Sequence, residues 1–243
     1  MKILKNSKSS QPYITVVCCQ HGNEQFGLNV FDLLQDYIDS IPGLQIIVAN
    51  EEAVAINKRC VEEDLNRSYP GDPNGSLESR LACKLMEAIQ GSRYVLDIHT
   101  SVSSCGFLVP IIADKNEHAL HVLNLLDTPN IIAVEKPLAN KALIGNISGA
   151  VSLEFQKDLV GPERALKVMK DLVLGLSKNK KKKPQTRNMF TASGILPKEL
   201  ILPEGAKDYE YIPDLGIYPL ILKDPSYMGN QGLKGTKKEV LEI

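Results

Sequence analysis

Short runs of apolar residues, rich in β-branched side chains, alternate with amphipathic segments as far as residue 176. The first run, Ile14 to Cys19, is apolar at almost every position, which is typical of a central strand covered on both faces. Between these runs, apolar side chains recur at helical spacing. One such segment begins at Ser76, a good N-cap, and ends at Gly91. Strands that alternate with helices predict an α/β fold with a largely parallel sheet and helices on both faces. The strands are expected at residues 14–19, 44–49, 94–98, 106–112, 131–134 and 151–155.

The composition changes after residue 177, where a hydrophilic segment contains four consecutive lysines and ends at Pro184. We therefore predict an α/β domain over residues 1–177, a lysine-rich linker over 178–184 and a small β domain over 185–243. A lysine run could also bind nucleic acid or act as a localisation signal. No aromatic or arginine side chain accompanies this one, which favours a solvated linker.

Composition excludes several classes of partner. The formal net charge is -1 and Trp is absent, so neither a global electrostatic field nor a base-stacking surface for nucleic acid is expected. The apolar run at Ile14 to Cys19 is too short for a signal sequence or a membrane span. The five cysteines follow no disulfide framework, which indicates a reducing compartment. We expect a cytoplasmic protein that binds neither membranes nor nucleic acid, and its oligomeric state stays open.

The first candidate site is His21-Gly22-Asn23-Glu24, directly after the first predicted strand. Open α/β sheets bind their ligands at the carboxyl ends of strands. Gly22 permits a tight turn there, so that His21 and Glu24 could converge on one ion. Alone, this H-x-x-E pattern is weak, because a surface histidine and glutamate would also produce it.

His99 strengthens that interpretation, because it stands at the end of another predicted buried strand, in Asp97-Ile98-His99. Two imidazoles and one carboxylate form a catalytic zinc site with a fourth position open. Asp97 lies two residues earlier, on the same strand face, and could accept a histidine N–H. A hydrogen-bonded core histidine is the alternative for His99. The two other histidines, His118 and His121, are expected to face solvent.

Further polar residues stand where a substrate site needs them. Arg59, Asn66 and Arg67 precede a predicted helix and suit a substrate that bears a carboxylate. Glu154 interrupts the apolar strand 151–155, where a carboxylate must be paired, protonated or functional. Desolvation would raise the pKa of Glu154 towards the range of a general base. An edge-strand position that faces water is the alternative for Glu154.

Together, these motifs resemble the succinylglutamate desuccinylase/aspartoacylase family of the zinc carboxypeptidase clan. The resemblance rests on His21-x-x-Glu24, Asp64-Leu65-Asn66-Arg67, Asp97-Ile98-His99 and Glu154, in that order. It continues at Ile217-Tyr218-Pro219-Leu220 and Tyr227, which resemble a C-terminal strand of the family and its substrate-contacting tyrosine. The resemblance implies a zinc-carboxypeptidase-like mixed sheet flanked by helices.

The resemblance also implies roles for these residues. His21, Glu24 and His99 would bind one zinc ion per chain. Arg59 would polarise the scissile carbonyl, and Glu154 would act as base and then as acid. Asn66, Arg67 and Tyr227 would contact the substrate, a small acyl-amino-acid-type molecule.

The expected activity is zinc-dependent hydrolysis of the amide bond of an N-acyl amino acid or a related small amide that bears a carboxylate. A carboxypeptidase or amidase acting on peptides is the alternative within enzymes, and a non-catalytic zinc-dependent binding protein is the alternative outside them. One departure concerns the substrate. Aspartoacylases resemble one another in a substrate-binding arginine ten residues before the catalytic glutamate, and Ile144 stands at that position here.

Overall fold

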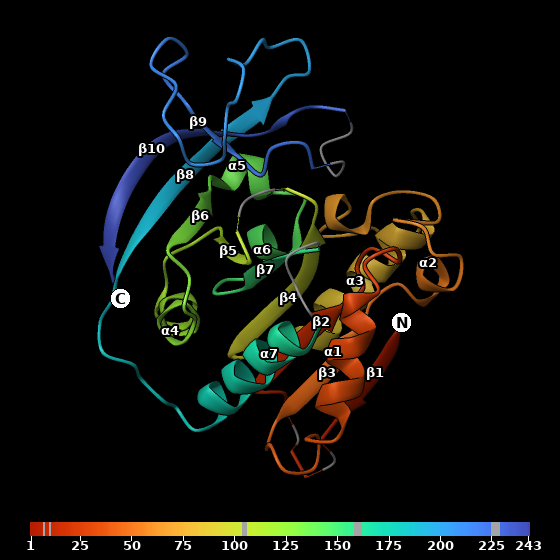
Figure 1. Cartoon of the computed structure of the whole chain (residues 1–243). Coiled ribbons are helices and arrows are strands. Elements are labelled where there is room, and N and C mark those ends of the chain that lie inside the picture. Colours follow the sequence, from red (N-terminus) through yellow and green to blue (C-terminus); the bar gives the residue numbers. More distant parts are fainter. Residues whose placement is uncertain (7, 10, 104–105, 158–161, 225–228) are drawn as a thin grey trace.

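A mixed sheet extends through the whole molecule, with helices on both of its faces (Figure 1). The structure, a computed structural model, describes residues 1–6, 8–9, 11–103, 106–157, 162–224 and 229–243. Within them, ten strands hydrogen-bond in the order β1-β3-β2-β4-β7-β5-β6-β8-β10-β9. The strands are β1 (Lys2–Lys5), β2 (Ile14–Cys18), β3 (Leu44–Val48), β4 (Tyr94–Ser101), β5 (Leu108–Ile112), β6 (Asn130–Val134), β7 (Val151–Gln156), β8 (Thr186–Leu196), β9 (Tyr218–Leu220) and β10 (Gly232–Glu242). The helices are α1 (Phe26–Gln35), α2 (Glu51–Ala55), the 3-10 turn η1 (Leu65–Arg67), α3 (Leu77–Ile89), α4 (Glu117–Leu125), α5 (Lys136–Ala139), α6 (Leu143–Asn146) and α7 (Pro162–Ser177).

The centre of the sheet is parallel, as the apolar runs predicted. Strands β3, β2, β4 and β7 all pair in parallel, whereas β5 pairs antiparallel with β7 and reverses the direction of the chain. Every residue of β2 is buried, because helices cover it on both sides. The predicted mixed α/β sheet flanked by helices is therefore confirmed, and the carboxyl ends of β2, β4 and β7 meet at one edge.

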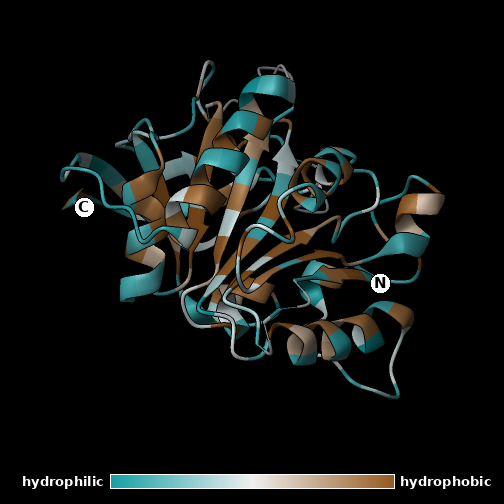
Figure 2. Ribbon diagram, turned by 90° about the horizontal axis from the view of Figure 1, so that it is seen from below, coloured by the Kyte–Doolittle hydropathy of each residue, from teal (hydrophilic) through white to brown (hydrophobic). Residues whose placement is uncertain are grey.

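Two apolar layers hold the helices on the sheet. Helices α1, α4 and α7 pack on one face, while α3, α5 and α6 pack on the other. Figure 2 shows the brown apolar strands between helices whose outer sides are teal. Helix α3 begins where the sequence predicted, since the Ser76 side chain accepts a hydrogen bond from Ser79 N. None of the helices described here combines the length and apolarity needed to cross a bilayer.

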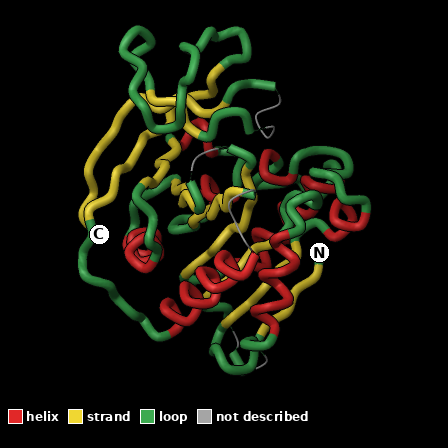
Figure 3. Tube along the Cα trace, in the orientation of Figure 1, coloured by secondary structure: helices red, strands yellow, loops and turns green. Residues whose placement is uncertain are grey.

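The C-terminal residues extend the same sheet. Strand β8 pairs in parallel with β6, and β10 pairs antiparallel with β8. Figure 3 shows strands and loops over this part of the chain, which follows α7. The expected linker, residues 178–184, runs along the outside of the molecule from α7 to β8 (Figure 1). The division of the chain into two domains stays a prediction, and the β6–β8 pairing joins the two parts through backbone hydrogen bonds.

The expectation that His118 and His121 face solvent is wrong. Both imidazoles pack edge-on against the Tyr94 ring, and the Tyr94 hydroxyl lies 2.7 Å from His121 Nδ1. His121 Nε2 also lies 2.6 Å from the Lys180 carbonyl oxygen, so α4 contacts the lysine-rich segment. A buried tyrosine hydroxyl needs a polar partner, and the imidazole of His121 provides one. The polar pattern of this helix does not show that Tyr94 packs against it.

Candidate metal and active site

A tight turn after β2 places His21 and Glu24 side by side. Cys19 adopts a left-handed backbone with φ of 54°, which turns the chain at the end of the strand. Gly22 then packs directly on the backbone of α2, and a Cβ at this position would lie 2.0 Å from the Ala53 carbonyl carbon. Glu24 N donates to His21 O at 3.1 Å and closes the turn. Only glycine fits at residue 22, so the close packing of this turn on α2 depends on that residue.

Strand β4 contributes His99 from the neighbouring position in the sheet. His99 Nε2 lies 3.0 Å from Asp97 Oδ2, which bears out the interpretation of Asp97 as an orienting carboxylate. Asp97 Oδ1 accepts a hydrogen bond from Gln20 Nε2 at 2.7 Å, and Tyr69 donates to Gln20 Oε1 at 2.7 Å. The His99 ring is therefore held by a buried network that extends from the turn after β2 to the segment after η1.

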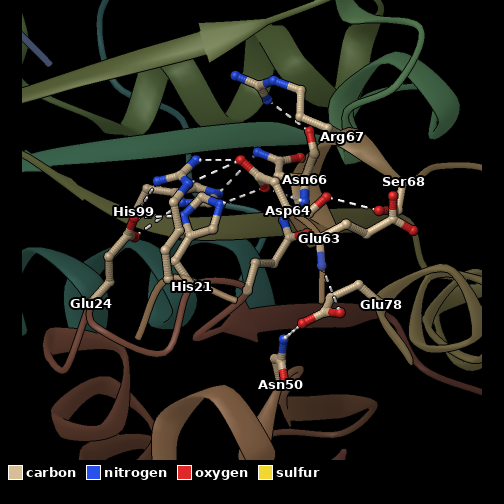
Figure 4. Close-up of polar contacts among 12 residues, drawn as sticks. His21, Glu24, Asn50, Glu63, Asp64, Asn66, Arg67, Ser68, Glu78 and His99 are labelled. Atoms are coloured by element: carbon tan, nitrogen blue, oxygen red, sulfur yellow. Dashed lines mark hydrogen bonds and ion pairs between the residues drawn. The ribbon is translucent and has the colours of Figure 1, made fainter. Parts of the chain in front are cut away.

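The imidazoles of His21 and His99 converge on Glu24 (Figure 4). His21 Nδ1 lies 2.6 Å from Glu24 Oε1, and His99 Nδ1 lies 3.1 Å from Glu24 Oε2. One ligand atom from each residue falls within 4.8 Å of the others, so the three side chains could hold a metal ion. Both Nε2 atoms face carboxylates instead, Asp97 for His99 and Asp64 for His21. Carboxylates behind metal-binding imidazoles fix the tautomer that leaves the other nitrogen for a cation.

The electrostatics of the cluster favour positive charge at its centre. Burial by itself raises the pKa of Glu24, but the imidazoles of His21 and His99 outweigh it and hold that pKa well below its usual range. For His99, burial by itself lowers the pKa, but the charges of Asp97 and Glu24 outweigh burial and raise the pKa well above its usual value. Three buried or half-buried carboxylates surround two imidazoles, and a bound cation would satisfy them.

The loop between α2 and η1 adds Arg59 and Asp64 to the cluster. Asp64 Oδ1 lies 3.0 Å from His21 Nε2, while Oδ2 accepts hydrogen bonds from Arg59 Nε at 3.0 Å and Nη2 at 2.7 Å. Arg59 Nη1 lies 3.9 Å from Glu24 Oε1. Although burial raises the pKa of Asp64, the hydrogen bond and charge of His21 and the charge of Arg59 hold it well below its usual range. Asp64 thus links the expected catalytic arginine to one of the expected ligands.

The two expected carboxylate-binding residues differ in their surroundings. Asn66 Oδ1 accepts a hydrogen bond from Leu143 N at 3.0 Å, and its Nδ2 lies 3.4 Å from His99 Nε2. Arg67 is exposed and donates to the Asn66 carbonyl oxygen at 2.7 Å (Figure 4). Both residues line the cavity described below. Arg67 is therefore an exposed residue of the cavity, whereas Asn66 also ties η1 to α6.

Glu154 lies on β7 beside His99. Burial raises the pKa of Glu154 to about 7, the charge of His99 opposes this rise, and the charges of Glu24 and Asp224 add to it. Among the described residues, no hydrogen-bond donor contacts its carboxylate. A carboxyl group with a pKa near neutrality can both accept and return a proton at the working pH of an enzyme.

A cavity of about 280 Å³ connects these side chains. His21, Glu24, His99, Arg59 and Glu154 all line it. The structure also places Asp224 in the cavity, where it accepts a hydrogen bond from Ser101 Oγ at 2.6 Å. No sequence motif singled out this residue. Tyr227, the remaining expected substrate contact, lies outside the described residues.

Comparison with known families identifies the family of this chain. A family model described as the succinylglutamate desuccinylase/aspartoacylase catalytic domain matches residues 10–176. The chain belongs to this family. A comparison with curated protein sequences finds no significant match.

Several solved structures share the fold over almost the whole chain. Murine aminoacylase 3 superposes with a TM-score of 0.72 at 18% sequence identity, over 96% of this chain and 97% of that one. The succinylglutamate desuccinylase from Chromobacterium violaceum superposes with a TM-score of 0.74 at 18% identity, over 99% of this chain and 88% of that one. The ectoine utilization protein EutE from Ruegeria pomeroyi gives 0.62 at 13% identity, over 99% and 83%. These likenesses extend beyond the matched catalytic domain into β8, β9 and β10.

Proposed function

We propose that this hydrolase-family chain is a zinc-dependent deacylase that cleaves the amide bond of an N-acyl amino acid or a similar small amide bearing a carboxylate. The observation that carries the proposal is the convergence, at one cavity, of a His-Glu-His cluster with the Glu154 carboxylate and the Arg59 guanidinium. A site that only binds its ligand needs neither a carboxyl group with a pKa of about 7 nor a cation beside it.

Zinc fits the donor set better than magnesium or calcium, because two imidazole nitrogens and one carboxylate are borderline-soft ligands. His21 and His99 would hold it through Nδ1, and Glu24 through its carboxylate. When bound, zinc supplies Lewis-acid chemistry that activates water and polarises a carbonyl group. One ion per chain is expected, since the structure offers one such cluster among the described residues.

The side chains of the protein carry the proton transfers. Glu154 accepts a proton from the attacking water as the new bond from oxygen to the acyl carbon forms. The Arg59 guanidinium stabilises the negative charge that develops on the former carbonyl oxygen. Glu154 then donates the proton to the amide nitrogen as the C–N bond breaks, which releases a carboxylic acid and an amine. Arg67 at the cavity wall would bind the substrate carboxylate.

The proposal is tested by amine release from a panel of N-acyl amino acids and short peptides. The zinc-loaded protein should hydrolyse at least one N-acyl amino acid, should lose this activity with a chelator and should regain it with zinc. Preference for peptides would move the chain to the carboxypeptidase or amidase alternative. Absence of amine release from every compound, with zinc stoichiometric, would reject a hydrolytic function on these substrates.

A further inference from the structure

The cavity has two chemically different halves. The polar half comes from the N-terminal strands and loops, with the His-Glu-His cluster, Arg59 and Arg67. The other half comes from β5, β6, α5, α6, β8 and β10, and its side chains are aliphatic. The residues of this apolar wall are Ile111, Val134, Leu138, Ile144, Ile195 and Leu233.

Most of the apolar wall is buried, although Ile195 is 43% exposed and Leu138 is half-buried. The cations of the cavity lie outside this wall. Ile144 is 8% exposed and Leu233 is 4% exposed. Lys141 and Arg67 line the same cavity but are exposed, so a substrate carboxylate can meet them at the mouth. A second carboxylate directed at the wall would lose its hydration without gaining a partner, whereas an apolar group there would leave water favourably.

We infer that the substrate carries an uncharged apolar group, in its amino-acid side chain or its acyl chain, that lies against this wall. This inference rests on the proposed function and narrows its substrate class. An N-acyl amino acid with one carboxylate and one aliphatic or aromatic group fits both halves of the cavity. A dicarboxylic substrate fits only one of them.

The test uses two matched series. In the side-chain series, N-acetyl-leucine and N-acetyl-phenylalanine are compared with N-acetyl-aspartate. In the acyl series, N-hexanoyl-glycine is compared with N-succinyl-glycine. We expect kcat/KM to favour the apolar member by about tenfold or more in at least one series. If kcat/KM for the acidic members equals or exceeds that for the apolar members in both series, the inference is overturned but the proposed function stands. Inactivity on every compound would overturn both.

A substitution in the wall gives a second readout. Ile144→Arg places a cation among the aliphatic side chains and should lower kcat/KM for the best apolar substrate by about tenfold while raising it for the acidic member of the same series. Ile56→Arg is the matched control, because Ile56 is 50% exposed and lies outside the cavity. If the ratio of kcat/KM between apolar and acidic substrates is unchanged in Ile144→Arg, the apolar group of the substrate does not lie against this wall.

A separate observation concerns Glu78, in the first turn of α3. Its carboxylate is fully buried and accepts hydrogen bonds from three consecutive backbone amides, Val61 N at 2.6 Å, Glu62 N at 3.1 Å and Glu63 N at 3.2 Å. Asn50 Nδ2 donates to it at 3.0 Å from the other side. Figure 4 shows Glu78 between Asn50 and the loop that leads to Asp64.

The loop bound by Glu78 is the segment that separates Arg59 from Asp64. Both of these side chains enter the cluster, and Asp64 supports His21. We infer that Glu78 is a positioning residue that fixes this loop and thereby aims the Arg59 guanidinium and the Asp64 carboxylate. Hydrogen bonds from backbone amides to a charged carboxylate are among the strong ones, so a single buried group can order the segment.

A double-mutant cycle tests this role, which also rests on the proposed function. Glu78→Gln replaces one acceptor oxygen by an NH₂ group that cannot accept from the loop. With saturating zinc, kcat should fall about 10- to 100-fold in the native background and by no more than about twofold in an Arg59→Ala background. Equal losses in both backgrounds would indicate general destabilisation and overturn the inference.

Hydrogen exchange gives a readout that needs no catalysis. The amides of residues 59–64 should exchange faster in Glu78→Gln, while those of β4 and β7 keep their protection. Glu87→Gln, an exposed change on the same helix, should alter neither exchange nor kcat. If Glu78→Gln does not fold, Glu78→Asp keeps the charge but shortens the side chain, and the same cycle applies. Native exchange in the loop of either folded variant would contradict the role.

Discussion

His99 on β4 and Glu154 on β7 are register partners in the parallel pairing of these strands. Directly paired residues of neighbouring strands project from the same face of a sheet, so the imidazole and the carboxylate enter the cavity together. The sheet therefore fixes the distance between an expected metal ligand and the expected general base through backbone hydrogen bonds rather than through a loop. A group held in this way needs little reorganisation during a reaction.

Glu154→Gln keeps the size of the side chain and removes the proton acceptor. The variant should fold and bind zinc, because Glu154 contributes no atom to the metal cluster. Its kcat should fall by roughly 10²- to 10⁴-fold, the usual contribution of a positioned general base. Steady-state kinetics and zinc analysis on one preparation check this, with Glu117→Gln on the surface of α4 as the control. A kcat within a few-fold of the native value, at full zinc content, would assign the base to another residue.

His99→Ala removes one of the three expected ligands and leaves a buried space beside Glu24. Elemental analysis should show that most of the zinc is lost, since two remaining ligands hold the ion poorly. The circular dichroism spectrum should stay close to that of the native protein, because the strand keeps its backbone pairing. His118→Ala is the matched control, as this histidine packs on Tyr94 away from the cluster. Stoichiometric zinc in purified His99→Ala would show that the ligand set is wrong.

Arg67→Ala should change substrate preference more than reactivity. The exposed guanidinium lines the cavity without belonging to the metal cluster, so its expected contact is with a spectator carboxylate. KM for an N-acyl amino acid should rise about tenfold or more, while hydrolysis of an uncharged acyl ester should change little. Arg80→Ala, at an exposed position on α3, is the control. Proportional losses on both substrates would place Arg67 in the chemical step.

The convergence of His21, Glu24 and His99 could be predicted from sequence because each of these residues follows or ends a recognisable buried strand. His21 and Glu24 sit in a glycine turn after β2, and His99 sits near the end of β4. Their convergence then depends only on the adjacency of two parallel strands, a common arrangement in α/β sheets. Local pattern and fold agree at this site.

The apolar wall and Asp224 could not be predicted in the same way. The wall depends on the pairing of β6 with β8, in which Ile132 lies opposite Phe190, and on the return of β10 along β8. Long-range pairing of this kind leaves no periodic signal in the sequence. Asp224 is buried by its contact with Ser101, more than a hundred residues earlier, and nothing in its local sequence distinguishes it from a surface aspartate.

The lysine-rich segment should be the first site of tryptic cleavage. Residues 180–183 are exposed, and their four consecutive lysines repel one another. His121 of α4 contacts the Lys180 carbonyl oxygen, and Asn124 makes two hydrogen bonds with the Lys182 backbone. These contacts leave the lysine side chains accessible. Limited digestion followed by mass spectrometry should locate the first cut here, and replacing the four lysines with glutamine should delay it. A first cut within the predicted strands would reject this segment as the domain boundary.

Asp208 should make the folding stability of the protein depend on pH. Burial raises the pKa of Asp208 to about 6, although hydrogen bonds from Leu222 N and Ile221 N oppose the rise. Its Oδ2 atom is buried without a hydrogen-bond partner among the described residues. The pKa in the unfolded chain is about 3.9, so the folded state binds the proton more tightly. The contribution of Asp208 is therefore most favourable below about pH 4 and is lost as the pH rises through about 6.

Asp208→Asn keeps the acceptor for Leu222 N and removes the charge that burial penalises. The variant should gain about 1–3 kcal/mol in free energy of unfolding at pH 7.5 and close to nothing near pH 4, as a shift of about two pKa units requires. Urea unfolding of the native protein and the variant at several pH values measures this difference. Asp214→Asn, at an exposed position nearby, should show no such trend. A gain of equal size at all pH values would trace the stabilisation to packing rather than to ionisation, because only a change in protonation makes the difference between the two proteins vary with pH.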